Sequence, residues 1–304
     1  MTPPTKSDPA WAAPPKPDSG GAGPTPHTPP VSVAIQGEPG AFSHTAAEKL
    51  FGPGIQLVPT RTFDELFEAV VTGRAHRAMV PVENTLAGSV QGNLDRILRH
   101  SLHVVAETRV RIRLCLAAPP GKTLSDIRTA ASHPVALQQC QAFFAGHPEM
   151  EPVPVYDTAG SIRDLMSGGA AYDAAIGSDL AVRLYGARIL VEEIEDNPEN
   201  HTRFFAVSLE AGPAPTGKPK TSLAFVVTHE PGSLHRALGV FAQRGVDLTK
   251  LESRPIPGRP WEYRFFADVR GDAEGELGEA LEELGRLAAE LTILGSYTEC
   301  ERVD

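Results

Sequence analysis

The strongest constraint on the fold is a change of pattern at the Pro- and Gly-rich segment 211–220. Before this segment, short β-rich runs alternate with amphipathic helical runs, which favours parallel sheets covered by helices. After it, residues 221–304 follow the order strand, helix, strand, strand, helix, strand, which is the ferredoxin-like pattern. The segment itself contains Gly-Pro-Ala-Pro and Gly-Lys-Pro, a composition typical of a linker. The sequence therefore predicts an α/β class chain with two units.

The unit before the linker divides further into two lobes, because its alternation restarts after the segment 108–116. The second lobe is predicted at about residues 112–188. The expected strands are 31–35, 78–82, 129–132, 153–156, 174–177, 189–192 and 202–208. The expected helices are 43–50, one behind a capping box at Thr62, 135–144, 161–166 and 178–185. Two such lobes would leave a cleft at strand ends and helix N-termini, where small ligands bind.

The unit after the linker has its own expected elements. The predicted strands are 222–228, 247–254, 263–269 and 294–299, and the predicted helices are 234–243 and 276–291. Residues 1–30 are rich in Pro, Gly, Ala and Ser and are predicted to be a disordered tail, with a docking arm as the alternative. The tail has no apolar stretch of the kind that a secretory signal needs.

Composition excludes several classes of function. A net charge of −10 argues against nucleic acid as the main partner. No window approaches the roughly 18 uninterrupted apolar residues of a membrane-spanning helix. Cys115, Cys140 and Cys300 are far apart and lack metal-ligand spacing, so neither a disulfide scaffold nor a zinc site is expected. A reducing cytoplasm fits best.

The segment Asn200-His201-Thr202-Arg203-Phe204-Phe205 brings a carboxamide, a hydroxyl and a guanidinium together just before an apolar strand. A hydroxyl can donate a hydrogen bond to a leaving group, and a guanidinium can hold a carboxylate in a two-point fork. The alternative is a purely structural Thr-Arg pair. If the functional interpretation holds, Thr202 and Arg203 are the candidate catalytic residues.

Polar or small residues also follow several other expected strands. They occur in Pro81-Val82-Glu83-Asn84-Thr85, Ser132-His133-Pro134 and Asp157-Thr158-Ala159-Gly160, and Gly37–Ser43 precedes the first helix. Helix caps and turns are the structural alternatives. The functional interpretation places these motifs around the cleft, with Ser89 a few residues after Glu83-Asn84-Thr85 and Gln138 one turn into the helix that follows Ser132-His133-Pro134.

These motifs occur in one order and are followed after the linker by Glu252-Ser253-Arg254-Pro255. In this order they resemble the prephenate dehydratase family, over roughly residues 32–300. The resemblance implies a bilobal, periplasmic-binding-protein-like catalytic domain at 31–210 and a ferredoxin-like ACT regulatory domain at 221–304.

The resemblance also implies a reaction. Prephenate would lose carbon dioxide and hydroxide to give phenylpyruvate for phenylalanine biosynthesis, a downhill reaction that needs no cofactor and no metal. Thr202 would assist the leaving group, and Arg203 would hold or orient a carboxylate. The residues implied to bind substrate are Glu83, Asn84, Thr85, Ser89, Ser132, Gln138, Thr158, Asn200 and Phe204. The family usually has Ser at Thr85, and Asp157 and Gly160 depart from its commonest form. The choice between prephenate and arogenate therefore stays open.

The C-terminal module resembles an ACT domain and implies feedback by L-phenylalanine. The implied effector-binding residues are Gly232, Ser233, Leu234, Glu252, Ser253 and Arg254. Because such a site needs two copies, a homodimer or homotetramer is expected. Trp261, Tyr263, Phe265 and Phe266 are expected to pack within a strand and the core rather than to bind the ligand. The alternatives are an arogenate dehydratase and a non-catalytic amino-acid sensor.

Overall fold

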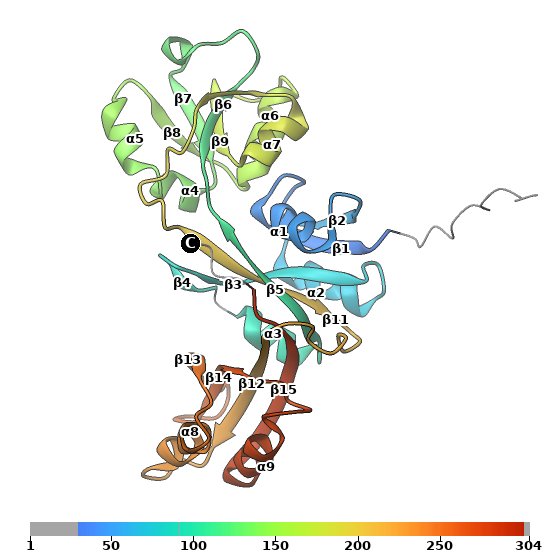
Figure 1. The fold of residues 1–304 in the computed structure, drawn as a ribbon. Coiled ribbons are helices and arrows are strands. Elements are labelled where there is room, and N and C mark those ends of the chain that lie inside the picture. Colours follow the sequence, from blue (N-terminus) through green and yellow to red (C-terminus); the bar gives the residue numbers. More distant parts are fainter. Residues whose placement is uncertain (1–29, 91, 301–304) are drawn as a thin grey trace, which may run out of the picture.

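The computed structural model describes residues 30–90 and 92–300, so the predicted tail lies almost entirely outside the described part. Figure 1 shows three bodies in a row: the second lobe, the first lobe, and the C-terminal domain. The second lobe and the C-terminal domain flank the first lobe. Among the described residues, no helix combines the length and apolar character needed to cross a membrane.

The first lobe is built on a mixed sheet with the strand order β2-β1-β3-β11-β5, and the short β4 pairs with β3. β1 is parallel to β2 and β3, whereas β11 is antiparallel to both β3 and β5. The expectation of a parallel sheet is therefore correct only for its first strands. The strands are β1 (Ser32–Gln36), β2 (Gln56–Thr60), β3 (Arg77–Asn84), β4 (Gly88–Ser89), β5 (His103–Arg111) and β11 (His201–Ser208).

Three helices accompany this sheet, namely α1 (Phe42–Phe51), α2 (Phe63–Val71) and α3 (Asn93–Arg99). The predicted start of α2 is confirmed, because the Thr62 side chain accepts a hydrogen bond from the Glu65 amide at 3.1 Å. The Glu65 carboxylate accepts from the Arg61 amide rather than from Thr62 itself. The apolar spacing then buries Leu66 and Phe67 in the core.

The second lobe has a five-stranded sheet in the order β10-β6-β9-β7-β8. Its strands are β6 (Cys115–Ala118), β7 (Thr129–Ser132), β8 (Glu151–Pro154), β9 (Ala174–Gly177) and β10 (Arg188–Val191). Its helices are η1 (Leu124–Asp126), α4 (Pro134–Gln138), α5 (Gln141–Gly146), α6 (Thr158–Met166) and α7 (Asp179–Tyr185).

The single helix predicted at 135–144 is wrong, because the chain breaks it into α4 and α5. The cause is Asp196, which lies far along the sequence. Its carboxylate accepts hydrogen bonds from the Gln141 and Ala142 amides at 3.0 and 2.8 Å, and so caps a new helix there. Its own amide donates to the Gln139 carbonyl at 2.7 Å. Tertiary contacts therefore override the apolar periodicity.

The C-terminal domain has the predicted strand and helix order, with a four-stranded sheet ordered β13-β14-β12-β15. The elements are β12 (Pro219–Val227), α8 (Ser233–Gln243), β13 (Leu248–Pro255), β14 (Tyr263–Arg270), α9 (Gly278–Leu287) and β15 (Ala288–Thr298). The helix predicted at 276–291 ends at Leu287. Ala288 and Glu290 pair instead with β12, so tertiary pairing overrides local helix propensity.

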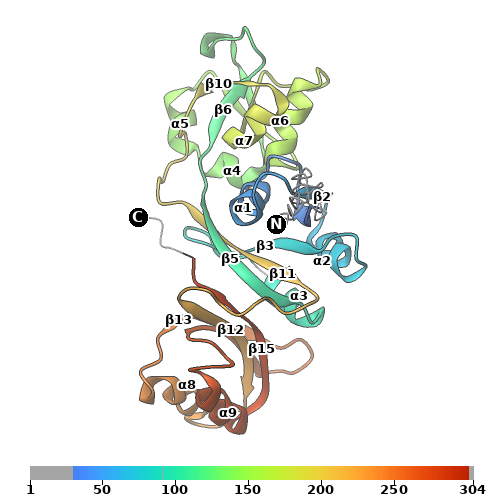
Figure 2. The ribbon, with the colours of Figure 1, turned by 45° about the vertical axis from the view of Figure 1, so that its right-hand side comes forward.

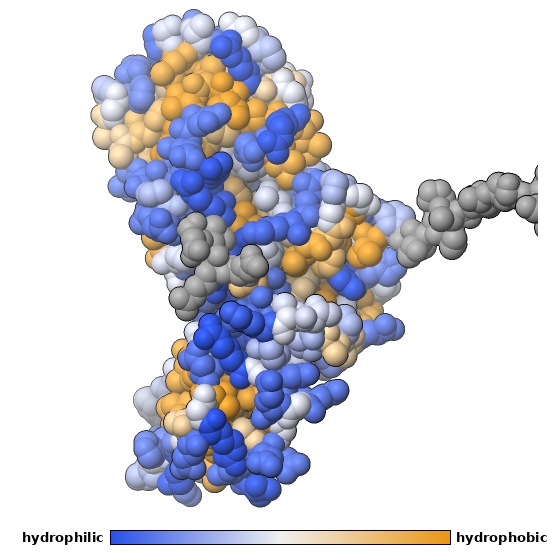
Figure 3. All heavy atoms as spheres, in the orientation of Figure 1, coloured by the Kyte–Doolittle hydropathy of each residue, from blue (hydrophilic) through white to orange (hydrophobic). Residues whose placement is uncertain are grey.

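The first lobe and the C-terminal domain share one hydrophobic core. Leu66 and Phe205 from the lobe belong to the same buried cluster as Phe266 and Tyr297 from the C-terminal domain. Figure 2 shows β12 and β15 reaching up to the underside of the first lobe. On the face seen in Figure 3, hydrophilic residues gather around this junction, outside the shared core.

Candidate functional site

Three polar side chains meet where β3 ends and β11 begins. The Asn84 amide nitrogen lies within hydrogen-bond distance of Asn200 Oδ1 at 2.8 Å, of Thr202 Oγ1 at 3.0 Å and of the His201 carbonyl at 3.1 Å. All three residues are buried, and Asn200 is only 1% exposed. Because Thr202 Oγ1 accepts from Asn84, its own proton is free to point elsewhere. The amide nitrogen of Asn200 is buried and has no partner among the described residues, so this cluster holds a donor without an acceptor.

A β-bulge in β3 brings Asn84 to this cluster. The register against β11 shifts between Arg203, which pairs with Glu83, and Phe204, which pairs with Pro81. Val82 is therefore an extra residue, and strict alternation beyond it is lost. Without this bulge, Asn84 would point to the face opposite Thr202. Bulges often re-aim a side chain beside a functional site.

The N-terminus of α1 lies at the same edge of the sheet as this cluster. α1 follows the carboxyl end of β1, which is parallel to β3, so α1 begins at the edge where Asn84 lies. α1 also packs on the sheet face that carries Phe204, and hence on the Thr202 side of β11. Within the described residues, no side chain caps the first turn of α1. Its free amides can therefore face an anion.

The two lobes are joined beside α1 by contacts from the loop after β1. Glu38 forms an ion pair with Arg163 at 2.6 Å and accepts a hydrogen bond from the Tyr156 hydroxyl at 2.6 Å. Ser178 donates to the Gly40 carbonyl at 2.6 Å. A Cβ at Gly40, whose φ is +92°, would lie 2.7 Å from Ala181, so only glycine permits this approach.

Arg203 does not belong to this cluster, so the structure places the two candidate catalytic residues, Thr202 and Arg203, on opposite faces of β11. Neighbouring residues on a strand point to opposite faces, and Arg203 points toward the C-terminal domain. Its Nε donates to Glu107 at 2.7 Å, its Nη1 to Asp268 at 2.5 Å and its Nη2 to the Tyr297 hydroxyl at 3.1 Å. Burial alone would lower the pKa of Arg203, but the surrounding Tyr297, Asp268 and Glu107 raise that pKa well above its usual value.

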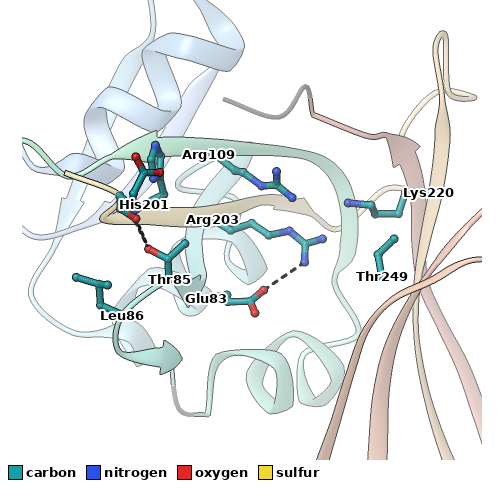
Figure 4. A pocket seen from close by; sticks show the side chains of 9 residues that line it. Glu83, Thr85, Leu86, Arg109, His201, Arg203, Lys220 and Thr249 are labelled. Carbon is teal, nitrogen blue, oxygen red and sulfur yellow. Dashed lines mark hydrogen bonds and ion pairs between the residues drawn. The ribbon is translucent and has the colours of Figure 1, made fainter. Parts of the chain in front are cut away.

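A cavity of about 510 Å³ opens on this second face, at the junction with the C-terminal domain. Figure 4 shows Arg109 and Arg203 extending side by side toward Lys220 and Thr249. Glu83, one of the predicted substrate ligands, also lines this cavity and lies 3.8 Å from Arg203. The predicted site is therefore divided between two faces of β11.

Thr85 and Ser89 are held by other parts of the protein. The Thr85 hydroxyl donates to the Glu199 carbonyl at 2.7 Å and accepts from the His201 amide at 2.9 Å, which fixes the two chain segments together. Ser89 donates to Glu252 at 2.6 Å, across the domain boundary. Neither side chain joins the Asn84 cluster.

The remaining predicted substrate ligands are scattered. Ser132 is fully buried and donates to the Ile176 carbonyl at 2.8 Å, and Phe204 packs in the core beneath α1. Gln138 is exposed at the end of α4.

Thr158 is the first residue of α6. The Asp157 side chain caps the first turn of this helix, because its carboxylate accepts a hydrogen bond from the Gly160 amide at 2.6 Å. Burial raises the pKa of Asp157.

The predicted effector residues also fall into two groups. Ser233 and Leu234 line a cavity of about 140 Å³ with Trp261 and Tyr263, and Gly232 begins α8 in the left-handed conformation. Tyr263 begins β14 as expected, but Trp261 is 77% exposed and Tyr263 is 41% exposed, so the expectation that they pack in the core is wrong. Phe265 does pack, 5.4 Å from Phe225, and Phe266 is buried.

The second group lies on the edge strand β13 and faces the first lobe. Glu252 accepts from Ser89, and Arg254 forms an ion pair with Asp95 at 2.9 Å. Ser253, between them, is exposed. None of these residues lines the cavity beside Trp261. Within one protomer, the two halves of the predicted effector site therefore do not meet.

The remaining chemistry-bearing groups show no further site. In residues 30–90 and 92–300, no group of three or more His, Cys, Asp or Glu side chains could hold a metal ion. The three cysteines are free. Burial raises the pKa of Cys115 and Cys140 to about 12 and that of Cys300 to about 11, so each thiol stays protonated at neutral pH.

Comparison with known proteins decides the family. The family model for prephenate dehydratase matches residues 33–211, and the model for the ACT domain matches residues 221–289. The chain belongs to the prephenate dehydratase family. It is accordingly a lyase that acts on prephenate.

Similar proteins cover most of this dehydratase. Arogenate dehydratase/prephenate dehydratase 2 of Arabidopsis thaliana, a chloroplastic protein, is 38% identical over 88% of this chain and 72% of its own length. The structure of a prephenate dehydratase from Arthrobacter aurescens in complex with L-Phe has a TM-score of 0.77 at 34% identity, covering 88% of this chain and 90% of that one. A structure described as a quorum-quenching acylase, GqqA, has a TM-score of 0.80 at 37% identity, with coverage of 88% and 97%.

Several residues that shape this dehydratase were not found by sequence reasoning. Glu107, Lys220, Asp268 and Tyr297 surround Arg203, although they are far apart in the sequence. One signal was present for Asp268, which stands between the apolar residues Ala267 and Val269 in β14. Charged residues in such positions are rarely buried without partners.

Proposed function

We propose that this dehydratase converts prephenate to phenylpyruvate at the Asn84, Asn200 and Thr202 cluster. The ring carboxylate leaves as carbon dioxide, and its bonding electrons enter the ring. The hydroxyl, which is attached to the ring carbon across from the carboxylate, takes up a proton and departs as water. The aromatic ring that forms makes the reaction downhill, so the protein needs to hold two carboxylates and assist one leaving group.

The observation that carries the proposal is the hydrogen bond from Asn84 to Thr202 Oγ1 at 3.0 Å. It occupies the oxygen as an acceptor and leaves the Thr202 proton for the departing hydroxyl. A threonine hydroxyl is a weak acid, so Thr202 acts as a preorganised donor rather than as a proton source. The unpartnered amide of Asn200 is a second donor in the same cluster.

The first turn of α1 supports carboxylate binding. It lies at the same sheet edge as Thr202, on the same face, and it lacks a side-chain cap. Backbone amides at a helix N-terminus attract anions without adding a formal charge. In this proposal, Arg203 does not touch the substrate, since its nitrogen atoms already bond Glu107, Asp268 and Tyr297.

Regulation belongs to the same proposal. L-phenylalanine would bind in the cavity lined by Ser233, Leu234 and Trp261, and a second protomer would complete that site. The L-Phe complex of the similar Arthrobacter aurescens dehydratase supports this effector. We accordingly propose a cytoplasmic homodimer or homotetramer that L-phenylalanine inhibits.

The test compares prephenate with arogenate as substrates of the purified full-length chain. Phenylpyruvate from prephenate, at a kcat/KM above that for phenylalanine from arogenate, is the expected result. A preference for arogenate would make the chain an arogenate dehydratase, the activity also named for the Arabidopsis relative. Turnover of neither substrate by folded protein would favour an amino-acid sensor.

A matched pair of variants then tests Thr202. Thr202→Val keeps the shape and removes the hydroxyl, whereas Thr202→Ser keeps the hydroxyl. We expect Thr202→Val to lower kcat by roughly 10²- to 10³-fold, the usual effect of losing one preorganised donor. Thr202→Ser should retain most of the activity. Equal kcat values for the two folded variants would remove the Thr202 hydroxyl from the mechanism.

A further inference from the structure

The buried charge cluster around Arg203 joins the two domains at the strand that carries Thr202. Arg203 and Glu107 come from neighbouring strands of the first lobe, and Asp268 and Tyr297 come from the C-terminal domain. Arg203, Glu107 and Asp268 are each less than a tenth exposed. A buried arginine with fixed partners can hardly move without moving them too.

Ion pairs and hydrogen bonds connect the members of this cluster to one another. Lys220 lies 2.8 Å from the other oxygen of Glu107 and 3.4 Å from Glu299, so the two cations face three carboxylates. Ser222 donates to Asp268 at 2.5 Å and lies 2.6 Å from the Tyr297 hydroxyl. Arg203 also stacks over the Phe205 ring, with 4.7 Å between the guanidinium carbon and the ring centroid. A connected polar network of this kind restrains the side-chain positions of its members.

We propose that Arg203 is a positioning residue, which fixes β11, and with it Thr202, to the sheet of the C-terminal domain. This inference rests on the proposed role of Thr202. A shift of β14 would move Asp268, then Arg203, and then the peptide that carries Thr202. The cluster thereby gives the C-terminal domain direct mechanical contact with the catalytic strand.

A second set of contacts joins the C-terminal domain to β3 and β4 of the first lobe. Lys250 lies 3.5 Å from Glu83, and Glu252 accepts from Ser89 in β4. Glu83 pairs with both Ser89 and Arg203 in the sheet. β13 and β14 therefore hold both strands that supply the Asn84 and Thr202 cluster.

The alternative role for Arg203 is to bind a substrate carboxylate, and the two roles predict different kinetics. A substrate ligand affects KM when it is removed, and its partner Asp268 would then matter little. A positioning residue mainly affects kcat, and removing Asp268 should have the same effect as altering Arg203.

The experiment is a double-mutant cycle in the full-length chain with Arg203→Lys, Asp268→Asn and their combination. We expect each single variant to lower kcat by about 10- to 100-fold, with KM for prephenate within about threefold of wild type. The kcat of the double variant should be no lower than that of the less active single variant, because both changes break the same interaction. The L-phenylalanine concentration for half inhibition should shift in both single variants.

The matched control is Arg264→Gln, which also lies on β14 but pairs with Glu290 away from the first lobe. It should keep the wild-type kcat. Losses that multiply in the combination, or a raised KM in Arg203→Lys with normal kinetics in Asp268→Asn, would overturn the proposal.

Arg203→Lys is a severe change, so Tyr297→Phe provides a milder test. It removes only the hydroxyl that bonds Arg203 and Ser222. Far-UV circular dichroism and thermal unfolding establish that each variant is folded. A folded Tyr297→Phe with unchanged kcat and unchanged inhibition would contradict the inference. If Tyr297→Phe is unchanged while Thr202→Val is inactive, only the positioning role of Arg203 is refuted. If the wild-type protein itself does not turn over prephenate, the proposed function is refuted.

Discussion

Replacing Asn200 with alanine separates a functional amide from a structural one. The Asn200 side chain is 1% exposed, accepts one hydrogen bond from Asn84 at 2.8 Å, and leaves its amide nitrogen without a partner in the described part of the chain. The backbone bonds of Asn200, to Ile112 and Asn197, survive the substitution. The variant therefore removes only the side-chain groups.

The magnitudes follow from these contacts. Losing the hydrogen bond from Asn84 costs about 1 kcal/mol of the free energy of unfolding, while removing the unsatisfied buried donor returns about 1–3 kcal/mol. The small cavity left by the amide costs roughly 1 kcal/mol. These contributions nearly cancel, so stability should change by less than about 2 kcal/mol. If the amide donates to the transition state, kcat should fall by roughly 10²- to 10³-fold.

The assay measures phenylpyruvate formation from prephenate and urea unfolding on the same preparations. Asn197→Ala is the control, since Asn197 lies in the same segment and its side chain bonds only the Glu199 amide among the residues that the structure describes. It should keep most of the activity. A folded Asn200→Ala variant with kcat within about threefold of wild type would refute the reasoning, as would an equal loss in Asn197→Ala.

Three further outcomes are expected. Arg163→Gln removes the ion pair with Glu38 that joins the lobes, so KM for prephenate should rise, and steady-state kinetics that show no change would disprove the link. Burial would raise the pKa of Glu107, but Arg203 and Lys220 lower it below its ordinary value. The stability that Glu107 contributes is therefore present at neutral pH and is lost as pH falls through its lowered pKa. In urea unfolding, Glu107→Gln should then lower the free energy of unfolding at pH 7 and weaken its decrease at acid pH. An unaltered decrease at acid pH would contradict this. Trp261→Ala should weaken L-phenylalanine binding in calorimetry, and wild-type affinity would exclude Trp261 from the effector site.

Much of the architecture could be predicted because it depends on local pattern. The strands at 129–132 and 174–177 and the starts of α2 and α8 follow from apolar runs, caps and turns near them in sequence. The predicted helix at 135–144 failed because Asp196, more than fifty residues on, caps a new start at Gln141. Long-range contacts of this kind leave no mark on local periodicity.

The site was harder to predict than the fold. Thr202 and Arg203 are adjacent in sequence, but the strand predicted there has a period of two, which already implied opposite faces. The grouping of Asn84 with Thr202 depends on a bulge at Val82 that alternation alone does not indicate. The partners of Arg203 come from other strands and another domain, so only the assembled fold brings them together.

The core shared by the first lobe and the C-terminal domain limits how this chain can be exchanged or dissected. Phe205 packs in one cluster with Phe266 and Tyr297, and Arg203 is neutralised partly by Asp268. A chimera that receives the regulatory domain of a relative would inherit a mismatched apolar surface and an arginine that lacks one carboxylate. Transferring regulation between such enzymes therefore requires transferring the C-terminal domain together with the first-lobe residues that contact it. For the same reason, the two modules should evolve in step rather than shuffle independently.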